Sequence, residues 1–371
     1  MACSEFDGQV VRLESELKDV MDQFVRVRLI QCNSLDLNLF QFDYDLTFAA
    51  FFLSPDKSIY GRYGTRSSDI EASREISIAG FRKAMEGALE LHQEYPSNRK
   101  ALVGKTGPPA KFSIAQELPS LTGKYTPFLD YKGQVARSCI HCHMIGEGAR
   151  KEARSSSEPM KDEIIYPWPM PNVVGLAFDP QERATLLHVE PDSVADQNGF
   201  KKGDEVLELD GQPMISIADV QWVLHRTTPP TNLRSIVKRG TETIALKLPI
   251  SPNWRQVSDI SWRTTSWDLR RIATGGLLLK SLTDEERIAA SLGMNQLGLR
   301  VEHVGQYGAH AIAKKAGFKK NDIIVTFDGS SKAARETELF AHILRKRSPE
   351  TNIPVTVLRQ GKRLRFELKI Q

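Results

Sequence analysis

The 371-residue sequence has few cysteines, no long apolar run and little net charge. Four cysteines are too few for a scaffold that disulfide bonds hold together. The longest apolar stretch, residues 46–53, is too short to cross a bilayer, and no charged-then-apolar signal peptide opens the chain. A formal net charge of +4, from 50 basic and 46 acidic residues, predicts no nucleic acid and no membrane surface as a partner.

Two catalytic motifs are also missing from the sequence. No G-x-S-x-G run occurs, so we do not expect a serine protease. Residues 103–106, with the sequence VGKT, look like the end of a phosphate-binding loop, but Arg99 stands where that loop requires glycine. The chain is long enough for two or three domains, and its 40% hydrophobic and 26% charged residues are typical of globular proteins.

A short motif with the sequence CIHCH occupies residues 139–143. Two thiols three positions apart, followed at once by an imidazole, form the pattern to which haem is covalently attached. Thioether bonds from Cys139 and Cys142 would fix the porphyrin edge, and His143 would be the proximal iron ligand. Residues 144–148 are similar to the stretch after the haem site in many c-type cytochromes. The motif therefore predicts a covalent haem c.

Two other chemistries fit the same residues. Cys139 and Cys142 could form a redox dithiol, with neighbouring histidines lowering the pKa of one thiol. The thiolates could instead bind zinc together with His141 or His143, although structural zinc takes four ligands and no second C-x-x-C pair exists. A loop without special chemistry is the remaining interpretation.

The distal haem ligand must come from outside the motif, because Met144 follows the proximal histidine too closely to reach the opposite face of the ring. The candidates are Met170, Met160 and His92. We favour Met170, since a proline on either side would hold it in an extended segment. Packing of Met170 against Trp168 at a domain edge is the alternative.

The first 95 residues alternate helical and strand patterns. Apolar spacing predicts a helix, a strand, a hairpin of two strands and a second helix, over residues 9–24, 25–30, 47–53 with 58–64, and 75–94. This order resembles a thioredoxin-like α/β domain that has lost its first strand. The resemblance assigns residues 1–95 to that domain.

The thioredoxin resemblance places Cys3 at the redox position, where the dipole of the following helix would stabilise a thiolate. Phe6 stands where a partner thiol would be, and Leu46 with Thr47 replaces the usual cis-proline turn. We therefore predict a weak or inactive reductase. Cys32, at the end of a predicted strand, is interpreted as a small buried hydrophobe.

Residues 96–171 are rich in proline, glycine, lysine and serine, which predicts an irregular linker or wrap that carries the CIHCH motif. From residue 172 the sequence repeats itself. Residues 198–211, NGFKKGDEVLELDG, recur as residues 316–329, AGFKKNDIIVTFDG. Two copies of this length indicate two similar domains.

Each copy resembles a PDZ domain of the bacterial type found behind high-temperature-requirement proteases, over residues 172–250 and 276–371. The resemblance implies small β-barrel or sandwich domains that bind an extended or C-terminal peptide by strand addition beside a groove helix. Backbone amides of a glycine-hydrophobic loop would hold the terminal carboxylate.

The resemblance also assigns peptide-binding residues on the loop and on the groove helix of each copy. In the first copy these are Val174, Gly175, Leu176 and Ala177 on the loop and Val220 and Leu224 on the helix. In the second copy they are Leu297, Gly298, Leu299 and Arg300 on the loop and Leu339 and Ile343 on the helix. A role in the core alone is the other interpretation for the helix residues.

A tryptophan-rich bridge over residues 251–275 joins the copies, and we expect its aromatic side chains to dock them on each other. The complete order is similar to a group of bacterial extracytoplasmic thioredoxin/PDZ proteins, some of which carry selenocysteine near the active position of the first domain. The expected architecture is an α+β multidomain chain. The resemblance implies a periplasmic or otherwise extracytoplasmic location, with the export signal missing from this sequence.

These patterns predict an extracytoplasmic tandem PDZ protein that binds peptides and carries haem c for electron transfer or redox sensing with a redox partner. Three alternatives remain. The first is a thiol-disulfide oxidoreductase that uses Cys3 or the Cys139/Cys142 pair, the second is a metal-binding protein at the same thiols, and the third is a non-enzymatic PDZ scaffold.

Overall fold

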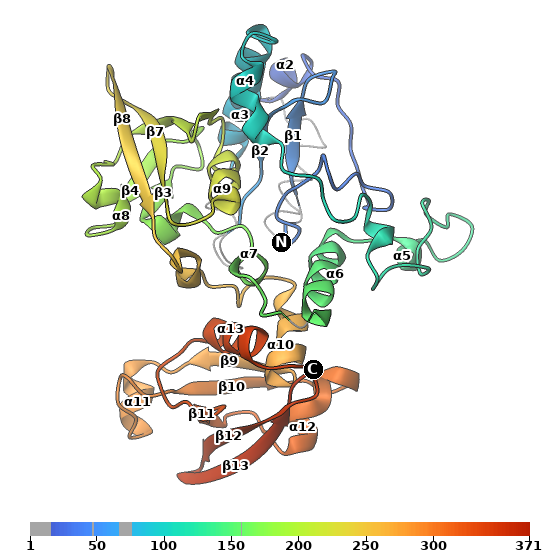
Figure 1. The fold of residues 1–371 in the computed structure, drawn as a ribbon, viewed down its shortest axis with the longest axis vertical. Coiled ribbons are helices and arrows are strands. Elements are labelled where there is room, and N and C mark those ends of the chain that lie inside the picture. Colours follow the sequence, from blue (N-terminus) through green and yellow to red (C-terminus); the bar gives the residue numbers. More distant parts are fainter. Residues whose placement is uncertain (1–15, 47, 67–75, 157) are drawn as a thin grey trace. The chain divides into compact units, whose positions relative to one another are not determined.

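The computed structural model describes residues 16–46, 48–66, 76–156 and 158–371 (Figure 1). They divide into two compact units. The first unit combines residues 1–149 with residues 166–258, and the second combines residues 150–165 with residues 259–371. Each unit contains one copy of the sequence repeat. Among the described residues, no helix is long and apolar enough to cross a membrane.

The N-terminal part of the first unit is a hairpin covered by a helix. Strands β1 (Ala50–Leu53) and β2 (Ile59–Tyr63) pair antiparallel, and the long helix α3 (Ile78–Gln93) packs against β2. The hydroxyl of Ser77 caps α3 by accepting a hydrogen bond from Gly80 N. Phe52, Tyr60 and Phe81 lie in the core between them, together with the single-turn helix α2 (Lys18–Met21).

The strand predicted over residues 25–30 does not form. These residues belong to no strand, and their apolar side chains lie in solvent, with Val25 96% and Val27 80% exposed. The alternating pattern predicted a strand wrongly because an extended segment becomes a strand only beside a hydrogen-bonding partner strand. The hairpin of β1 and β2 is a two-stranded sheet.

Of the predicted thioredoxin-like order, the hairpin and the helix after it form among the described residues. Residues 9–15 of the helix predicted over residues 9–24 lie outside the described residues, as do Cys3 and Phe6, and the described remainder contains the single-turn helix α2. The thioredoxin-like domain and the redox role of Cys3 stay predictions.

The region between the hairpin and the first repeat contains several short helices rather than an irregular wrap alone. They are α4 (Arg99–Leu102), η2 (Val103–Lys105), η3 (Ala115–Glu117), α5 (Val135–Ser138), α6 (Cys142–Ser155), α7 (Asp162–Ile165) and η4 (Pro171–Val174). A small hydrophobic core organises the part around the CIHCH motif. Its buried members are Leu35, Leu37, Ala115, Leu118, Leu121, Ile140 and Ile145.

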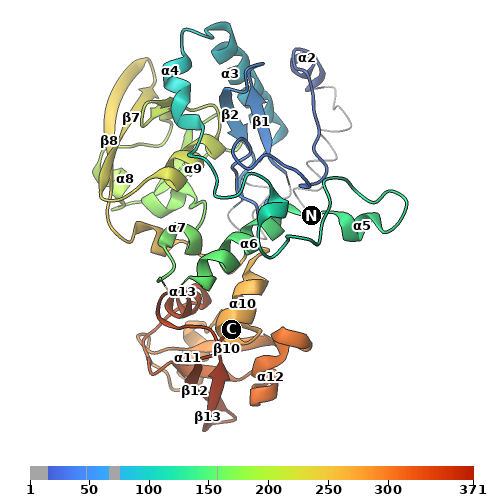
Figure 2. The same ribbon diagram turned by 45° about the vertical axis from the view of Figure 1, so that its right-hand side comes forward.

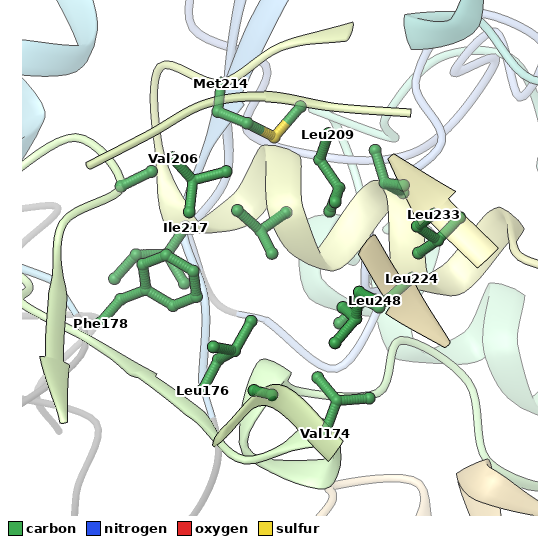
Figure 3. Close-up of a cluster of buried hydrophobic side chains, with 14 of the residues drawn as sticks. Val174, Leu176, Phe178, Val206, Leu209, Met214, Ile217, Leu224, Leu233 and Leu248 are labelled. Atoms are coloured by element: carbon green, nitrogen blue, oxygen red, sulfur yellow. The ribbon is translucent and has the colours of Figure 1, made fainter. Parts of the chain in front are cut away.

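The first repeat folds into two antiparallel sheets and a long helix. One sheet holds β3 (Leu176–Phe178) and β4 (Leu186–Val189), and the other has the order β6-β5-β7-β8. The remaining elements are α8 (Val194–Gln197), β5 (Glu205–Leu209), β6 (Gln212–Pro213), α9 (Ile217–Arg226), β7 (Thr231–Arg239) and β8 (Glu242–Ile250). Side chains from β3, β5, β7, β8 and α9 share one core (Figure 3).

The second repeat has one five-stranded antiparallel sheet with the order β13-β12-β11-β10-β9. Its strands are β9 (Leu277–Ser281), β10 (Leu299–Val304), β11 (Ile323–Phe327), β12 (Asn352–Arg359) and β13 (Lys362–Lys369). Its helices are α10 (Ser266–Thr274), α11 (Asp284–Ala289), η6 (Gly308–Ala311), α12 (Ile312–Ala316) and α13 (Glu336–Lys346). Helices α10 and α13 contact each other and β9 (Figure 1).

The same buried ion pair occurs in both repeats. Arg239 Nε lies 2.6 Å from Asp204 Oδ1 in the first, and Arg359 Nε lies 2.6 Å from Asp322 Oδ1 in the second. In each case the same guanidinium also donates to the carbonyl of the glycine in the repeated Gly-Phe pair. This repeated contact confirms that the sequence repeat is a structural duplication.

Residues of the predicted tryptophan-rich bridge lie in different units. Trp254, on η5 (Trp254–Val257), joins the core of the first repeat. Trp267 is 45% exposed in the second unit, with its ring edge-on to His303 at 6.0 Å. Docking of the two repeats through these side chains stays a prediction.

Candidate peptide-binding edges and a thiol cluster

The predicted carboxylate loop of the first repeat turns at Gly175. Its φ of +88° is a conformation that side-chain-bearing residues rarely adopt, and an added Cβ would lie 2.0 Å from Ser193 Oγ. Glycine is therefore required for the turn itself. Replacing Gly175 would disturb the fold as well as the loop, so this position is a poor probe of binding.

Strand β3, which follows this loop, has one free edge. Gly175 O accepts a hydrogen bond from Glu190 N at 2.9 Å, and Asp179 N donates to Thr185 O at 2.8 Å, so these groups face the β4 side. Backbone groups of successive strand residues point to alternate sides, so the N–H groups of Leu176 and Phe178 point away from β4. In the described part of the chain, β4 is the sole strand paired with β3. An outward edge of this kind is what strand addition requires.

The predicted groove side chains of the first repeat come together, but as part of a closed core. Leu176, Val220 and Leu224 are 3%, 1% and 0% exposed. Val174 is also buried, and Ala177 is half-buried. Figure 3 shows side chains of β3 and α9, among them Leu176, Phe178, Ile217 and Leu224, directed into this common cluster. An incoming side chain would have to displace part of it.

The proline-rich segment before the loop covers one side of α9. Trp168 stacks on His225 with ring centroids 4.1 Å apart, and its backbone N–H donates to His225 Nδ1 at 3.3 Å. Gln221 Nε2 donates to Trp168 O at 2.8 Å and to Met170 Sδ at 3.3 Å. Trp168 belongs to the same buried cluster as Val220 and Leu224. The thioether of Met170 is therefore engaged with α9.

Buried charge attaches the other side of α9 to the hairpin (Figure 2). Asp219 Oδ2 lies 2.9 Å from Lys105 Nζ, with both side chains fully buried, and Asp219 Oδ1 accepts from Arg62 N at 3.2 Å. The Arg62 guanidinium also lies over the ring of Trp222, 3.9 Å from its centroid. Burial lowers the pKa of Lys105, and burial lowers the pKa of Arg62 to about 10. No local sequence pattern marks this pair, since Lys105 stood out only for its likeness to a phosphate loop.

The prediction that residues 297–300 form the carboxylate loop of the second repeat is wrong. Leu299 and Arg300 open β10, which lies between β9 and β11 and has no free edge, and Leu297 N donates to Ser331 O at 2.7 Å. Gly298 is likewise buried before this internal strand. The Leu-Gly-Leu pattern led to a wrong prediction because α11 lies between the first two strands of the second repeat. The position that corresponds to Gly175 therefore lies upstream of α11.

Gly276 directly precedes β9, in the position that Gly175 has before β3. Gly276 has a φ of +92°, and an added Cβ would lie 2.0 Å from His310 O. The edge of β9 is occupied. Leu279 N donates to Glu336 Oε1 at 2.8 Å, and Glu336 forms a two-pronged ion pair with Arg270 of α10 at 2.7 and 3.0 Å.

The ion pair that occupies the edge of β9 is buried. Arg270 and Glu336 side chains are 5% and 3% exposed. Desolvation raises the pKa of Glu336, against the opposing effect of its hydrogen bond to Arg270. The predicted groove residues Leu339 and Ile343 are buried in the domain core. A peptide strand could add to β9 only after this ion pair opened.

The CIHCH motif comes together with a third thiol that the sequence interpretation had treated as a hydrophobe. Cys32 lies close enough to Cys142 for the two thiols to shift each other's pKa, and the Cys142 thiol donates a hydrogen bond to Leu46 O at 3.3 Å. Cys32 N donates to Ile140 O at 2.9 Å, which aligns Cys32 with the middle of the motif. Cys32, Cys139 and Cys142 are all free and half-buried.

The surroundings of the three thiols shift their pKa values in different directions. The interaction with Cys32, followed by backbone N–H groups at the start of α6, lowers the pKa of Cys142. The interaction with Cys142 raises the pKa of Cys32, and burial raises the pKa of Cys139. No sequence spacing could have paired Cys32 with a motif more than a hundred residues away.

The contacts of these side chains do not fit a covalent haem as they stand. Cys142 faces Cys32 and Leu46, so a thioether bond at Cys142 would require it to leave both. The ring of His143 stacks on that of His141, with centroids 5.6 Å apart and planes at 11°. Among the described residues, no group of three or more histidine, cysteine or acidic side chains is arranged to hold a metal ion. Haem c stays a prediction.

The distal-ligand candidates are engaged elsewhere. Met170 accepts a hydrogen bond from Gln221, and His92 Nδ1 lies 2.7 Å from the hydroxyl of Tyr60. Met160 is buried in the second unit. Neither Met170 nor His92 is oriented toward the motif by these contacts.

Comparison with known proteins identifies both repeats. A PDZ domain family model matches residues 172–250 and 287–370. Two curated proteins named as probable periplasmic serine endoprotease DegP-like are similar. That from Halomonas elongata is 25% identical over 186 residues, and that from Pseudomonas fulva is 24% identical over 180 residues. These alignments cover 50% and 48% of this chain but only 36% of either relative.

Several solved structures have a local likeness to this chain. The serine endoprotease from Yersinia pestis is 24% identical over 21% of this chain and 28% of its own, with a TM-score of 0.20. The HtrA-type protease AlgW with decapeptide is 18% identical over 38% and 48%, with a TM-score of 0.23. The HtrA3 PDZ domain bound to the phage-derived ligand FGRWV is 18% identical over 19% and 65%, with a TM-score of 0.17.

Proposed function

Because this chain contains two PDZ domains, we propose that it is a non-enzymatic scaffold that binds an extended peptide along β3 of the first domain. The observation that carries the proposal is the outward edge of β3. The amides of Leu176 and Phe178 point away from β4, beside α9, in the arrangement that PDZ domains use for strand addition.

The proposal assigns the two domains different roles. In the second domain, Glu336 already takes the amide of Leu279 that an added strand would need. In the first domain the equivalent helix position, the first residue of α9, is Ile217, which has no acceptor to offer. Peptide binding therefore belongs to the first domain, and the second serves as a closed structural module until its ion pair opens.

Main-chain hydrogen bonds supply the initial affinity in this mode of binding. Leu176, Val220 and Leu224 are buried with Trp168 in one cluster, so no preformed side-chain pocket is open beside β3. An anchoring side chain of the peptide enters by displacing Trp168 from α9. Affinity is therefore reduced by the cost of breaking the stack on His225 and the hydrogen bond from Gln221.

We also propose an extracytoplasmic location, by analogy with relatives whose names place them in the periplasm. The haem c predicted at Cys139, Cys142 and His143, for electron transfer or redox sensing, remains a separate proposal. Its test is the intact mass of protein produced with a haem-attachment system, and a polypeptide mass without an added haem would reject it.

Hydrogen exchange with a bound peptide tests the binding proposal. A library of extended and C-terminal peptides is screened against the full chain, and exchange of the backbone amides is then measured by mass spectrometry with and without the tightest binder. We expect new protection in peptic fragments that cover residues 174–179 and none in fragments that cover residues 277–281. Protection confined to the second domain, or a library without any binder, would reject the proposal.

A further inference from the structure

We propose that the open edge of β3 takes residues 25–30 of a second copy of this chain as its added strand. The inference rests on the proposed function, because it names a ligand for the same edge. Residues 25–30, with the sequence VRVRLI, belong to no strand, and all six are exposed. Among the described residues, neither this segment nor the outer edge of β3 has a partner strand, and each can supply one to the other.

The segment has the sequence of a strand although it does not form one within its own chain. Its apolar side chains alternate, and Val25, Val27 and Leu29 are 96%, 80% and 57% exposed. Six residues in a strand span about 20 Å, which is enough to cover the three residues of β3. Burial of the three apolar side chains, which now lie in water, would drive the addition.

Alternation decides which side chains of the segment would face α9. The three apolar side chains point to one side of an extended strand, and Arg26 and Arg28 point to the other. With its apolar side toward α9, the segment meets the cluster of β3 and α9 that contains Leu224, after Trp168 has moved aside. Displacement of Trp168 makes the contact weak, so the edge of β3 stays open in dilute protein.

Charges around the Gly175 loop favour a basic internal segment over a terminal carboxylate. Glu190 N donates to Gly175 O at 2.9 Å, and the Cβ of Glu190 lies 3.6 Å from the place that a Cβ on Gly175 would take. Glu190 lies 3.3 Å from His188 Nε2, which is a cation only when protonated, and Asp192 follows two residues later. Residues 168–174 contain no basic side chain. A terminal carboxylate would be repelled here, whereas the two arginines of the segment bring the complementary charge.

The position of the segment directs it to a second copy. In both ribbon views, the trace that follows α2 runs on the side of the hairpin away from α8 and β8 (Figures 1 and 2). It is therefore placed to meet the β3 edge of another copy rather than its own. Two copies that each insert a segment would close a dimer, and one-way addition would give an open chain. Either product has a mass above that of the monomer.

Sedimentation of the full chain at increasing concentration tests the inference. We expect the mean mass of the wild type to rise above the monomer mass. Val27→Asp places a charge on the face that would be buried, so it should weaken self-association by about tenfold or more. Val27 is 80% exposed in the single chain, so the melting temperature should not change. The matched control Val103→Asp, at a valine that is 69% exposed elsewhere, should associate like the wild type.

A peptide with the sequence of residues 23–31, QFVRVRLIQ, locates the contact. It is added to the Val27→Asp protein, whose β3 edge is intact. We expect it to protect peptic fragments that cover residues 174–179 from hydrogen exchange. The same peptide with the Val27→Asp change should bind about tenfold more weakly or less.

Three results would overturn the inference. They are a wild type that stays monomeric at every concentration, self-association that Val27→Asp leaves unchanged or that Val103→Asp weakens equally, and a 23–31 peptide that does not protect residues 174–179. A library peptide that still protects residues 174–179 would then leave the proposed function standing. Absence of protection there with every peptide would reject both.

Discussion

The two PDZ domains share a skeleton and differ at the edge where a ligand would add. Both hold their repeated Gly-Phe turn with the same buried pair, Asp204 with Arg239 and Asp322 with Arg359. The edge of β3 is open in the first domain, whereas Glu336 and Arg270 occupy the edge of β9 in the second. A conserved scaffold therefore does not by itself make a binding site.

The first residue of the groove helix accounts for much of this difference. It is Ile217 in the first domain and Glu336 in the second, and only the carboxylate can accept a strand amide. The element before the loop differs too. In the first domain it is the proline-rich segment with Trp168, and in the second it is α10, which supplies Arg270. Substitutions at these positions test what each one contributes to the difference between the two edges.

The largest expected effect concerns how the groove helices are supported. Asp219, the third residue of α9, is fully buried against Lys105, whereas Glu338, the third residue of α13, pairs with Arg335 near the surface. Removing one partner of a buried pair leaves the other charge uncompensated, so Asp219→Asn should lower the free energy of unfolding by about 3–5 kcal/mol.

The matched variant Glu338→Gln should cost under about 1 kcal/mol, because exposed pairs contribute little. Chemical denaturation of both variants, followed by circular dichroism, measures the difference. Equal losses would mean that the two groove helices are held by similar forces.

The next prediction transfers the closed edge to the first domain. In Ile217→Glu, a carboxylate at the start of α9 should accept the amide of Phe178, as Glu336 accepts that of Leu279. Affinity for the peptide selected from the library should fall at least tenfold, or about 1.4 kcal/mol. Ile217→Met, which keeps the position apolar, should stay within about twofold of wild type in the same titration. Similar losses in both variants would show that packing, and not the charge, controls access.

The converse change should open the second domain. The double variant Arg270→Leu with Glu336→Ile removes the whole buried pair, which is often neutral or stabilising when apolar side chains replace it. We expect the number of peptides bound per chain to rise from one to two in isothermal titration calorimetry. A folded double variant that still binds one peptide would show that other contacts of α10 keep β9 closed.

Sequence reasoning located the repeats because their turn and strand residues obey local rules. The Gly-Phe turn, the aspartate before the strand and the Asp-Gly hairpin recur at the same spacing in residues 198–211 and 316–329. The sequence predicted the turn at Gly175 for the same reason. It misplaced the second because α11 intervenes between β9 and β10, and an insertion leaves no mark on the Leu-Gly-Leu pattern at Leu297.

The features that the sequence did not reveal depend on contacts between distant segments. Residues 25–30 alternate like a strand but pair with no neighbouring strand, and strand formation requires such pairing. Cys32 reaches Cys142, and Lys105 reaches Asp219, only because the fold brings their segments together. A single sequence contains the residue types for these contacts but not their pairing.

Amide exchange in the free protein tests the contrast between the two edges most directly. Phe178 and Leu279 are the third residues of β3 and β9, and both amides point to the outer edge of their sheets. We predict that Leu279, bonded to buried Glu336, exchanges at least tenfold more slowly than Phe178, whose amide faces the open edge, and that this protection is lost in the double variant. Equal exchange at the two amides, or slower exchange at Phe178, would contradict the account.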